Sequence, residues 1–244
     1  MIPYTNILWA AVALFGLHLA SLYNYLLFHS IAEIFSVVIS GSIFMIAWNS
    51  RQIINNNYIL FLGIAYLFVG CVDLAHILAF KGMALFRGFD ANLPTQLWIV
   101  GRYLQGISLL AAPLFLKRQF NPAAVFRIFC IATLLLLAAV FYGVFPVCFI
   151  EGKGLTPFKI YSEYVISLIL LAALFLLFKH REQFDQAVLS LFSWSFAATI
   201  VSELAFTFSV VVYDLSNLIC HYFKIVSFYL IYKAINETGL QNPY

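Results

Sequence analysis

The sequence predicts an all-α integral-membrane protein, a polytopic transmembrane bundle of about eight helices. Of the 244 residues, 64% are hydrophobic and only 9% are charged, and the mean hydropathy is +0.98. Soluble domains do not carry so much apolar surface. The apolar residues form runs of roughly 18 or more, long enough for a helix to cross a bilayer, and they lack the alternation of membrane β-barrel strands.

Polar or turn-forming segments divide the chain into the expected helices. The first, residues 5–23, follows no basic segment and ends without a small-residue cleavage motif, so we interpret it as a retained helix rather than a signal peptide. No connecting segment is long enough for a soluble domain, and we therefore expect residues 1–244 to form one membrane domain. The other helices are expected at 26–48, 58–80, 96–116, 124–147, 160–178, 187–212 and 215–236.

Basic residues in the connecting segments predict the orientation, because cytoplasmic loops carry an excess of lysine and arginine. Seven such residues fall on one side of the membrane and four on the other, so we expect the first side to be cytoplasmic. An even number of helices then places both termini in the cytoplasm. The seven are Arg51, Lys117, Arg118, Arg127, Lys179, Arg181 and Lys233, and the four are Lys81, Arg87, Lys153 and Lys159.

Ionisable residues inside the predicted helices gather in the outer half of the bilayer. A charge in the hydrocarbon core costs at least about 2.5–3.5 kcal/mol, so such residues are expected to face the bundle interior and to pair. Three pairs lie three or four residues apart and therefore share a helix face. We predict one polar cavity open toward the outside. Its expected members are His29, Glu33, Asp73, His76, Arg102, Glu163, Glu203, His221 and Lys224, with His18 and Asn217 close by.

The residue types in this cavity suit more than one ligand. His29, Asp73, His76 and His221 are the candidate ligands for zinc, iron or copper, with Glu33 as a further ligand or as an acceptor behind them. Haem held by two histidines is an alternative. So are a proton site and a hydrogen-bonded network that only fixes helix packing. The residues for an anionic or other small ligand are Glu33, Asp90, Arg102, Glu163, Glu203, Asn217 and Lys224.

The loop 81–96 and the cysteines allow further expectations. Apolar side chains in this outer loop favour either a lid over the cavity or an ordinary interfacial loop. The four cysteines have no CxxC spacing, and Cys148 is expected to face the outside alone. Cys71 and Cys220 flank the polar pairs, and we expect both to be core residues rather than ligands.

Four segments of the chain resemble a known family. They are "NYLLFHSIAEIFSVVI", "NNYILFLGIAYLFVGCVDLAHILAFKGM", "GFDANLPTQLWIVGRYL" and "SNLICHYFKIVSFYLIYKAINETGL". They are similar to the bacterial membrane-associated sensor domains, specifically the third class of the MASE type. The resemblance implies an N-terminal sensory module of histidine kinases in two-component systems and of diguanylate cyclases in cyclic di-GMP signalling. It further implies the bacterial inner membrane, a homodimer, and a cytoplasmic output domain linked through residues 234–244.

We therefore expect a signal-input domain, itself not an enzyme, that binds a small ligand or metal from the periplasmic side. The last helix would pass the signal to a kinase or cyclase. The alternative is an intramembrane metal-dependent hydrolase acting on a lipid, which would need an open coordination position and a groove leading sideways into the bilayer. A transporter is disfavoured because the chain has no internal repeat and no charges in the inner half. A basic tract with interleaved aromatic residues is missing, which argues against nucleic-acid binding.

Overall fold

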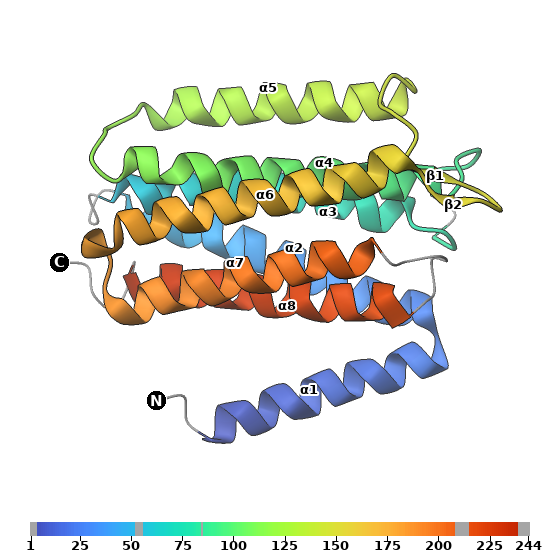
Figure 1. Cartoon of the computed structure of the whole chain (residues 1–244), viewed down its shortest axis with the longest axis horizontal. Coiled ribbons are helices and arrows are strands. Elements are labelled where there is room, and N and C mark those ends of the chain that lie inside the picture. The colour runs from blue at the N-terminus through green and yellow to red at the C-terminus, as the bar shows by residue number, and fades with distance from the viewer. Residues whose placement is uncertain (1–3, 52–55, 84, 208–214, 239–244) are drawn as a thin grey trace.

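The computed structural model describes residues 4–51, 56–83, 85–207 and 215–238, which form eight α-helices and one two-stranded hairpin (Figure 1). Seven of these helices, α2 to α8, are long and apolar enough to cross a membrane. The predicted all-α polytopic bundle is therefore confirmed. The α-helices are α1 (Tyr4–Tyr23), α2 (Tyr25–Ser50), α3 (Asn57–Ala79), α4 (Asn92–Ala111), α5 (Pro122–Phe141), α6 (Pro157–Lys179), α7 (Gln186–Phe206) and α8 (Leu215–Asn236). The strands are β1 (Phe149–Ile150) and β2 (Gly154–Leu155).

Several breaks in the apolar pattern act as helix caps. The side chains of Asn24, Asn56, Asn121 and Thr156 accept hydrogen bonds from backbone N–H groups in the first turns of α2, α3, α5 and α6. These groups have no partner within the helix, and a capping oxygen satisfies them. The polar residues between the apolar runs therefore fix where these helices begin.

Helix α3 lies at the centre of the bundle, packed against α2 and α4, and most of its residues are buried. Helix α8 packs against α7 and α2, and α6 packs against α4 and α7. Helix α5 lies along the outside of α3 and α4, and α1 lies beside α2 at the opposite edge (Figure 1). This arrangement leaves α1 and α5 as the peripheral helices, in agreement with the lack of buried charge in α5.

Small residues let α2 and α3 approach closely. A Cβ at Gly63 would overlap the Cβ of Ala47, and one at Gly70 would lie 2.8 Å from the Cβ of Ser40. Close backbone approach at small residues is the usual basis of helix packing in membranes. The two glycines therefore fix how α3 sits against α2.

The two ends of the bundle differ. Helix α1 begins and α8 ends at one end, which we call the terminal end, and the β1–β2 hairpin lies at the other, the hairpin end (Figure 1). The strands pair antiparallel, Phe149 with Leu155 and Ile150 with Gly154. The start of α1 and the end of α8 lie on one side, as expected for an even number of helices.

Some helix boundaries differ from the predicted ones. Helix α4 begins at Asn92 rather than at residue 96, because Pro94 is tolerated in a first turn. Helix α5 ends at Phe141 rather than at 147, and Gly143 with φ of +70° follows it. Helix α7 ends at Phe206, whereas its predicted extension at 208–212 lies outside the described residues, as do residues 239–244 of the predicted link.

Candidate metal centre

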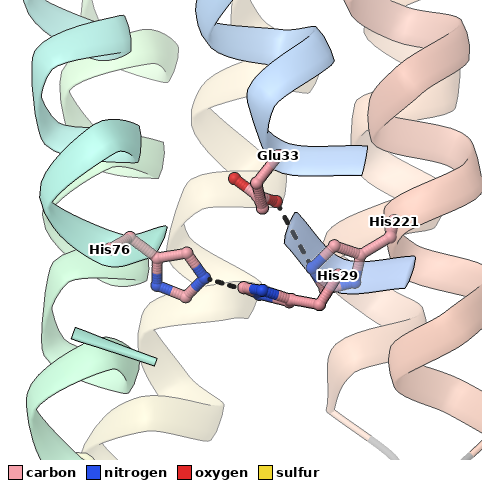
Figure 2. A group of neighbouring side chains, drawn as sticks. All are labelled: His29, Glu33, His76 and His221. Carbon is pink, nitrogen blue, oxygen red and sulfur yellow. Dashed lines mark hydrogen bonds and ion pairs between the residues drawn. The ribbon is translucent and has the colours of Figure 1, made fainter. Parts of the chain in front are cut away.

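Three histidines and one glutamate converge near the hairpin end of the bundle (Figure 2). His29 and Glu33 come from α2, His76 from α3 and His221 from α8, and all four are buried. One donor atom of each lies within 4.8 Å of every other. The shortest separations join His29 Nε2 to His76 Nε2 at 3.2 Å and His221 Nε2 to Glu33 Oε1 at 3.3 Å.

The helices themselves bring these side chains together. His29 and Glu33 are one turn apart near the start of α2, His76 lies in the last turn of α3, and His221 lies in the second turn of α8. Because α2 packs against both α3 and α8, the three helices present these residues at one level. The prediction that polar pairs on separate helices face each other is correct for this group.

Backbone carbonyls orient two of the histidines. His76 Nδ1 donates to the carbonyl of Pro94 at 2.8 Å, and His221 Nδ1 donates to the carbonyl of Asn217 at 2.7 Å. A carbonyl only accepts, so in each neutral ring the proton is on Nδ1 and the lone pair is on Nε2. Both Nε2 lone pairs therefore face the group, which is the arrangement that metal-binding histidines adopt.

Several buried polar atoms of the group have no hydrogen bond to any described residue. They are His221 Nε2 and Glu33 Oε1, which lie 3.3 Å from each other, and His29 Nδ1. The ring of His29 instead stacks on Phe80, with 3.6 Å between ring centroids. Buried atoms of this kind are costly unless something else satisfies them. A cation bound among the donor atoms would satisfy the first two.

A network of charges continues from Glu33 toward the middle of the bundle. Lys224 Nζ lies 2.5 Å from Glu33 Oε2 and 3.2 Å from Asp73 Oδ2. Arg102 Nη2 donates to both oxygens of Asp73, at 2.8 and 3.0 Å. Arg102 also donates to Gln105 at 2.5 Å. The network thus ties together α2, α3, α4 and α8.

A second buried group lies between α6 and α7. Lys159 pairs with Glu163 one turn later on α6, and its ammonium lies 4.0 Å from the ring centroid of Phe206. The placement of Lys159 in an outer loop was wrong, because α6 begins at Pro157 and buries this lysine completely. Glu203 on α7 is also buried, within electrostatic range of Lys159 and Arg102. It lies in the last turn of α7.

A small cavity of about 30 Å³ connects the group to the hairpin end. The three histidines line its inner side, and Lys81, Phe149 and Leu155 are among the residues at its other side. A cavity of this size holds a bare ion or one or two water molecules. Lys81 also donates to Glu151 of the hairpin at 2.8 Å, and this hydrogen bond lowers the pKa of the Glu151 carboxyl. Lys81, which lines the cavity, thus links the end of α3 to the hairpin.

Other predicted residues lie elsewhere. Asp73 is not among the four converging residues, because it pairs with Arg102 and Lys224. Asp90 is exposed and accepts from the N–H of Asn92, and it is not among the four converging residues. His18 is exposed on α1 and does not join the cavity.

All four cysteines are free thiols. Cys148 is buried, not facing the outside as predicted, because the loop before β1 folds back and its N–H donates to Asn92. Burial raises the pKa of its thiol to about 12. Cys220 is a buried neighbour of His221, whereas Cys71 is exposed on α3.

Two members of the polar network, Gln105 and Tyr66, were not predicted from the sequence. Gln105 bridges Arg102 and Tyr66, whose hydroxyl accepts from the Gln105 amide at 3.0 Å. Its spacing of three residues from Arg102 was the available signal. A spacing of four residues likewise places Lys159 beside Glu163 on α6.

Comparison with known families agrees with this architecture. A family model described as a membrane-associated sensor domain, MASE3, matches residues 20–243. The chain belongs to this family. The match includes all four converging residues and every helix from α2 to α8. No curated protein and no solved structure matches the chain.

The membrane-associated sensor domain is thus a multi-pass membrane protein with an input role. Its buried ionisable side chains form the network on α2, α3, α4 and α8 and a second group, Lys159, Glu163 and Glu203, on α6 and α7. Chemically, this site offers three imidazoles and one carboxylate, which are ligand types for zinc, iron or copper.

Proposed function

We propose that this sensor domain binds one transition-metal ion between His29, Glu33, His76 and His221 and reports its presence through α8. The observation that carries the proposal is the convergence of four buried donors, two of them with lone pairs directed inward by backbone carbonyls. A network built only for helix packing would satisfy its own atoms. Here Glu33 Oε1 and His221 Nε2 lie 3.3 Å from each other, and neither atom has a further hydrogen-bond partner within the described chain.

The separations suit a tetrahedral ion. Bonds of about 2.0–2.1 Å place adjacent ligand atoms about 3.3–3.4 Å apart. The His29–His76 separation is 3.2 Å and the His221–Glu33 separation is 3.3 Å. Since no donor pair exceeds 4.8 Å, small side-chain rotations would bring all four donors to bonding distance.

The same arrangement favours a sensor over a lipid hydrolase. A hydrolytic metal keeps one position for water, whereas four protein ligands complete a tetrahedral shell. The cavity of about 30 Å³ adjoins the loops of the hairpin end and has no room for a lipid headgroup. It has no room for a haem either, so a single ion is the better occupant.

Helix α8 is the proposed route of transmission. It contributes His221 to the ion and Lys224 to the network, and it contacts α2 and α7. An ion that binds one arrangement of these helices more tightly shifts the population toward that arrangement. The expected receiver is a histidine kinase or diguanylate cyclase following α8, in a homodimer in the bacterial inner membrane.

Elemental analysis of the protein, purified gently in detergent, tests the binding. We expect one metal ion per chain in the wild type and a loss of most of it in His76→Ala and His221→Ala. His18→Ala is the matched control, because His18 is exposed on α1, and it should retain the metal. Less than one ion per chain in folded wild-type protein would overturn the proposal.

A second experiment tests transmission. The chain is fused through α8 to a reporter kinase or cyclase, and the output is measured with and without the bound metal. We expect His76→Ala to abolish the metal response and His18→Ala to leave it intact. A metal response that persists in His76→Ala would remove this histidine from the sensing role.

A further inference from the structure

We propose that a second cavity at the hairpin end, formed by the end of α3, the loop that follows it and the hairpin, binds a small organic cation. The expected ligand carries one ammonium group on a short apolar body. The cavity measures about 300 Å³, against about 30 Å³ for the one beside the candidate metal centre. This volume is at the lower end of the range for small-molecule sites.

The site is separate from the candidate metal centre. None of the four converging residues lines the larger cavity, although Phe80 and Lys81 line both cavities. Phe80 is the residue that ends α3, and its ring stacks on His29. The two sites therefore share a wall but no ligand residue, and the proposal holds with or without bound metal.

Three phenylalanines supply the aromatic part of the larger cavity. Besides Phe80, these are Phe86 and Phe89 of the loop after α3. Both loop rings pack against Phe141, the last residue of α5, with 5.3 and 5.9 Å between ring centroids. Aromatic rings attract cations, and a cluster of them is the usual means of recognising an alkylated ammonium group.

The charges of the lining favour a ligand with one positive charge. Among the described residues, the charged members of the lining are Lys81, Asp90 and Glu151. Lys81 donates to Glu151 at 2.8 Å, so their charges cancel. Asp90 accepts from a backbone N–H at the start of α4 and has no ion pair with any described residue. One negative charge therefore remains for the ligand.

The same lining disfavours other occupants. A bare metal ion needs several oxygen or nitrogen ligands, whereas here one carboxylate lies among phenyl rings. An anion would meet the net negative charge. The exposed cations Arg87 and Lys153 lie nearby in the chain, but neither lines the cavity.

An ammonium group of this kind has two possible sources at the end of a membrane bundle. One is a dissolved amine, and the other is the headgroup of a zwitterionic lipid. Both carry the chemistry that the lining recognises. The test therefore uses a soluble probe first and then compares lipids.

The first arm measures binding of choline to the full chain in a non-ionic maltoside detergent, by saturation-transfer NMR titration. The comparison ligand is 3,3-dimethylbutan-1-ol, which has the shape of choline but no charge. We expect choline to bind at least about tenfold more tightly, from one carboxylate at close range in a partly solvated site. This comparison is made on the wild type, so it does not depend on the folding of a variant.

Two substitutions at exposed positions assign the binding to this cavity. Asp90→Asn keeps an acceptor for the backbone N–H and should weaken choline binding about tenfold. Phe89→Leu keeps an apolar side chain and should weaken it about two- to fivefold. Neither should change the affinity for the alcohol. Asp185→Asn, which alters an exposed carboxylate before α7, is the matched control and should change neither affinity.

The second arm identifies the source of the cation. Nanodiscs contain half phosphatidylglycerol and half of either phosphatidylethanolamine or the uncharged, amine-free digalactosyldiacylglycerol. Weaker choline binding in the phosphatidylethanolamine discs supports a lipid headgroup as the ligand, and equal binding supports a dissolved amine. Equal affinity for choline and the alcohol in detergent, no choline binding there, or a choline preference that survives both substitutions overturns the proposal. Each of these results leaves the metal content, and hence the proposed function, unaffected.

Discussion

Asp73 pairs with two cations at once and is buried together with them. Lys224 contacts one of its oxygens, and Arg102 donates to both. Ion pairs at the surface contribute little, because solvent screens them and side-chain entropy opposes them. In the bundle interior the loss of one partner leaves the other charge uncompensated, which is far more costly. Breaking an ion pair is therefore more costly in the interior of this bundle than at its surface.

Asp73→Asn should destabilise the protein by about 3–5 kcal/mol, because it leaves Arg102 and Lys224 with one carboxylate fewer between them. The measurement is the free energy of unfolding in detergent, from denaturant or thermal titration. Lys81→Met is the control: it breaks the exposed pair with Glu151 and should change stability by less than about 1 kcal/mol. Equal losses of unfolding free energy in the two variants would contradict the idea that burial makes the ion pairs of Asp73 more important than the exposed pair.

At the scale of the element, α3 determines the arrangement of the other helices around the centre. Gly63 and Gly70 bring it against α2, and this contact sets the rotation at which His76 meets His29. Helices α7 and α8 are joined by hydroxyl groups: Ser195 and Thr199 both hydrogen-bond to Ser227. Small and hydroxyl side chains are the usual contacts between membrane helices, where the bilayer itself gives little hydrophobic driving force.

Gly63→Val should disrupt the α2–α3 contact, because its side chain would overlap Ala47. We expect a large loss of folded protein, measured by size-exclusion chromatography after detergent extraction, together with loss of the metal. Gly41→Val is the matched control, since a Cβ at Gly41 on α2 meets nothing within 4 Å. Normal elution and metal content in Gly63→Val would show that the close approach is not required.

At the scale of the whole molecule, the two ends of the bundle differ in the basic residues of their loops. Helix α1 begins and α8 ends at the same end of the bundle (Figure 1). With Lys159 buried in α6, the basic loop residues predicted for the outer side fall to Lys81, Arg87 and Lys153, so the bias strengthens. By this charge bias we expect the hairpin end, which holds the candidate centre, to face the outside.

Thiol labelling tests this orientation, and it requires introduced cysteines because Cys148 is buried. Lys153→Cys lies in the exposed tip of the hairpin, and Glu182→Cys lies in the exposed turn between α6 and α7. Both variants carry Cys71→Ser and are studied in right-side-out vesicles. A membrane-impermeant reagent should label Lys153→Cys at once, and it should label Glu182→Cys only after the vesicles are permeabilised. The reverse pattern would invert the assignment of the two membrane faces.

The sequence by itself determined the class of protein, the approximate course of eight helices and the concentration of ionisable residues toward one end. These follow from local causes: apolar runs long enough to span a bilayer, capping residues between them, and the cost of burying charge. It also determined that His29 with Glu33, and Asp73 with His76, share helix faces, since that depends only on helical periodicity.

Only the tertiary structure decided which of these residues meet. Periodicity places Asp73 and His76 on one face, but the rotation of α3 against α2, α4 and α8 turns His76 toward His29 and Asp73 toward Arg102 and Lys224. The same packing brings Glu33 to His221 and encloses Lys159. Contacts between residues nearly 200 positions apart depend on how whole helices fit together, and the spacing within any one helix does not contain that information.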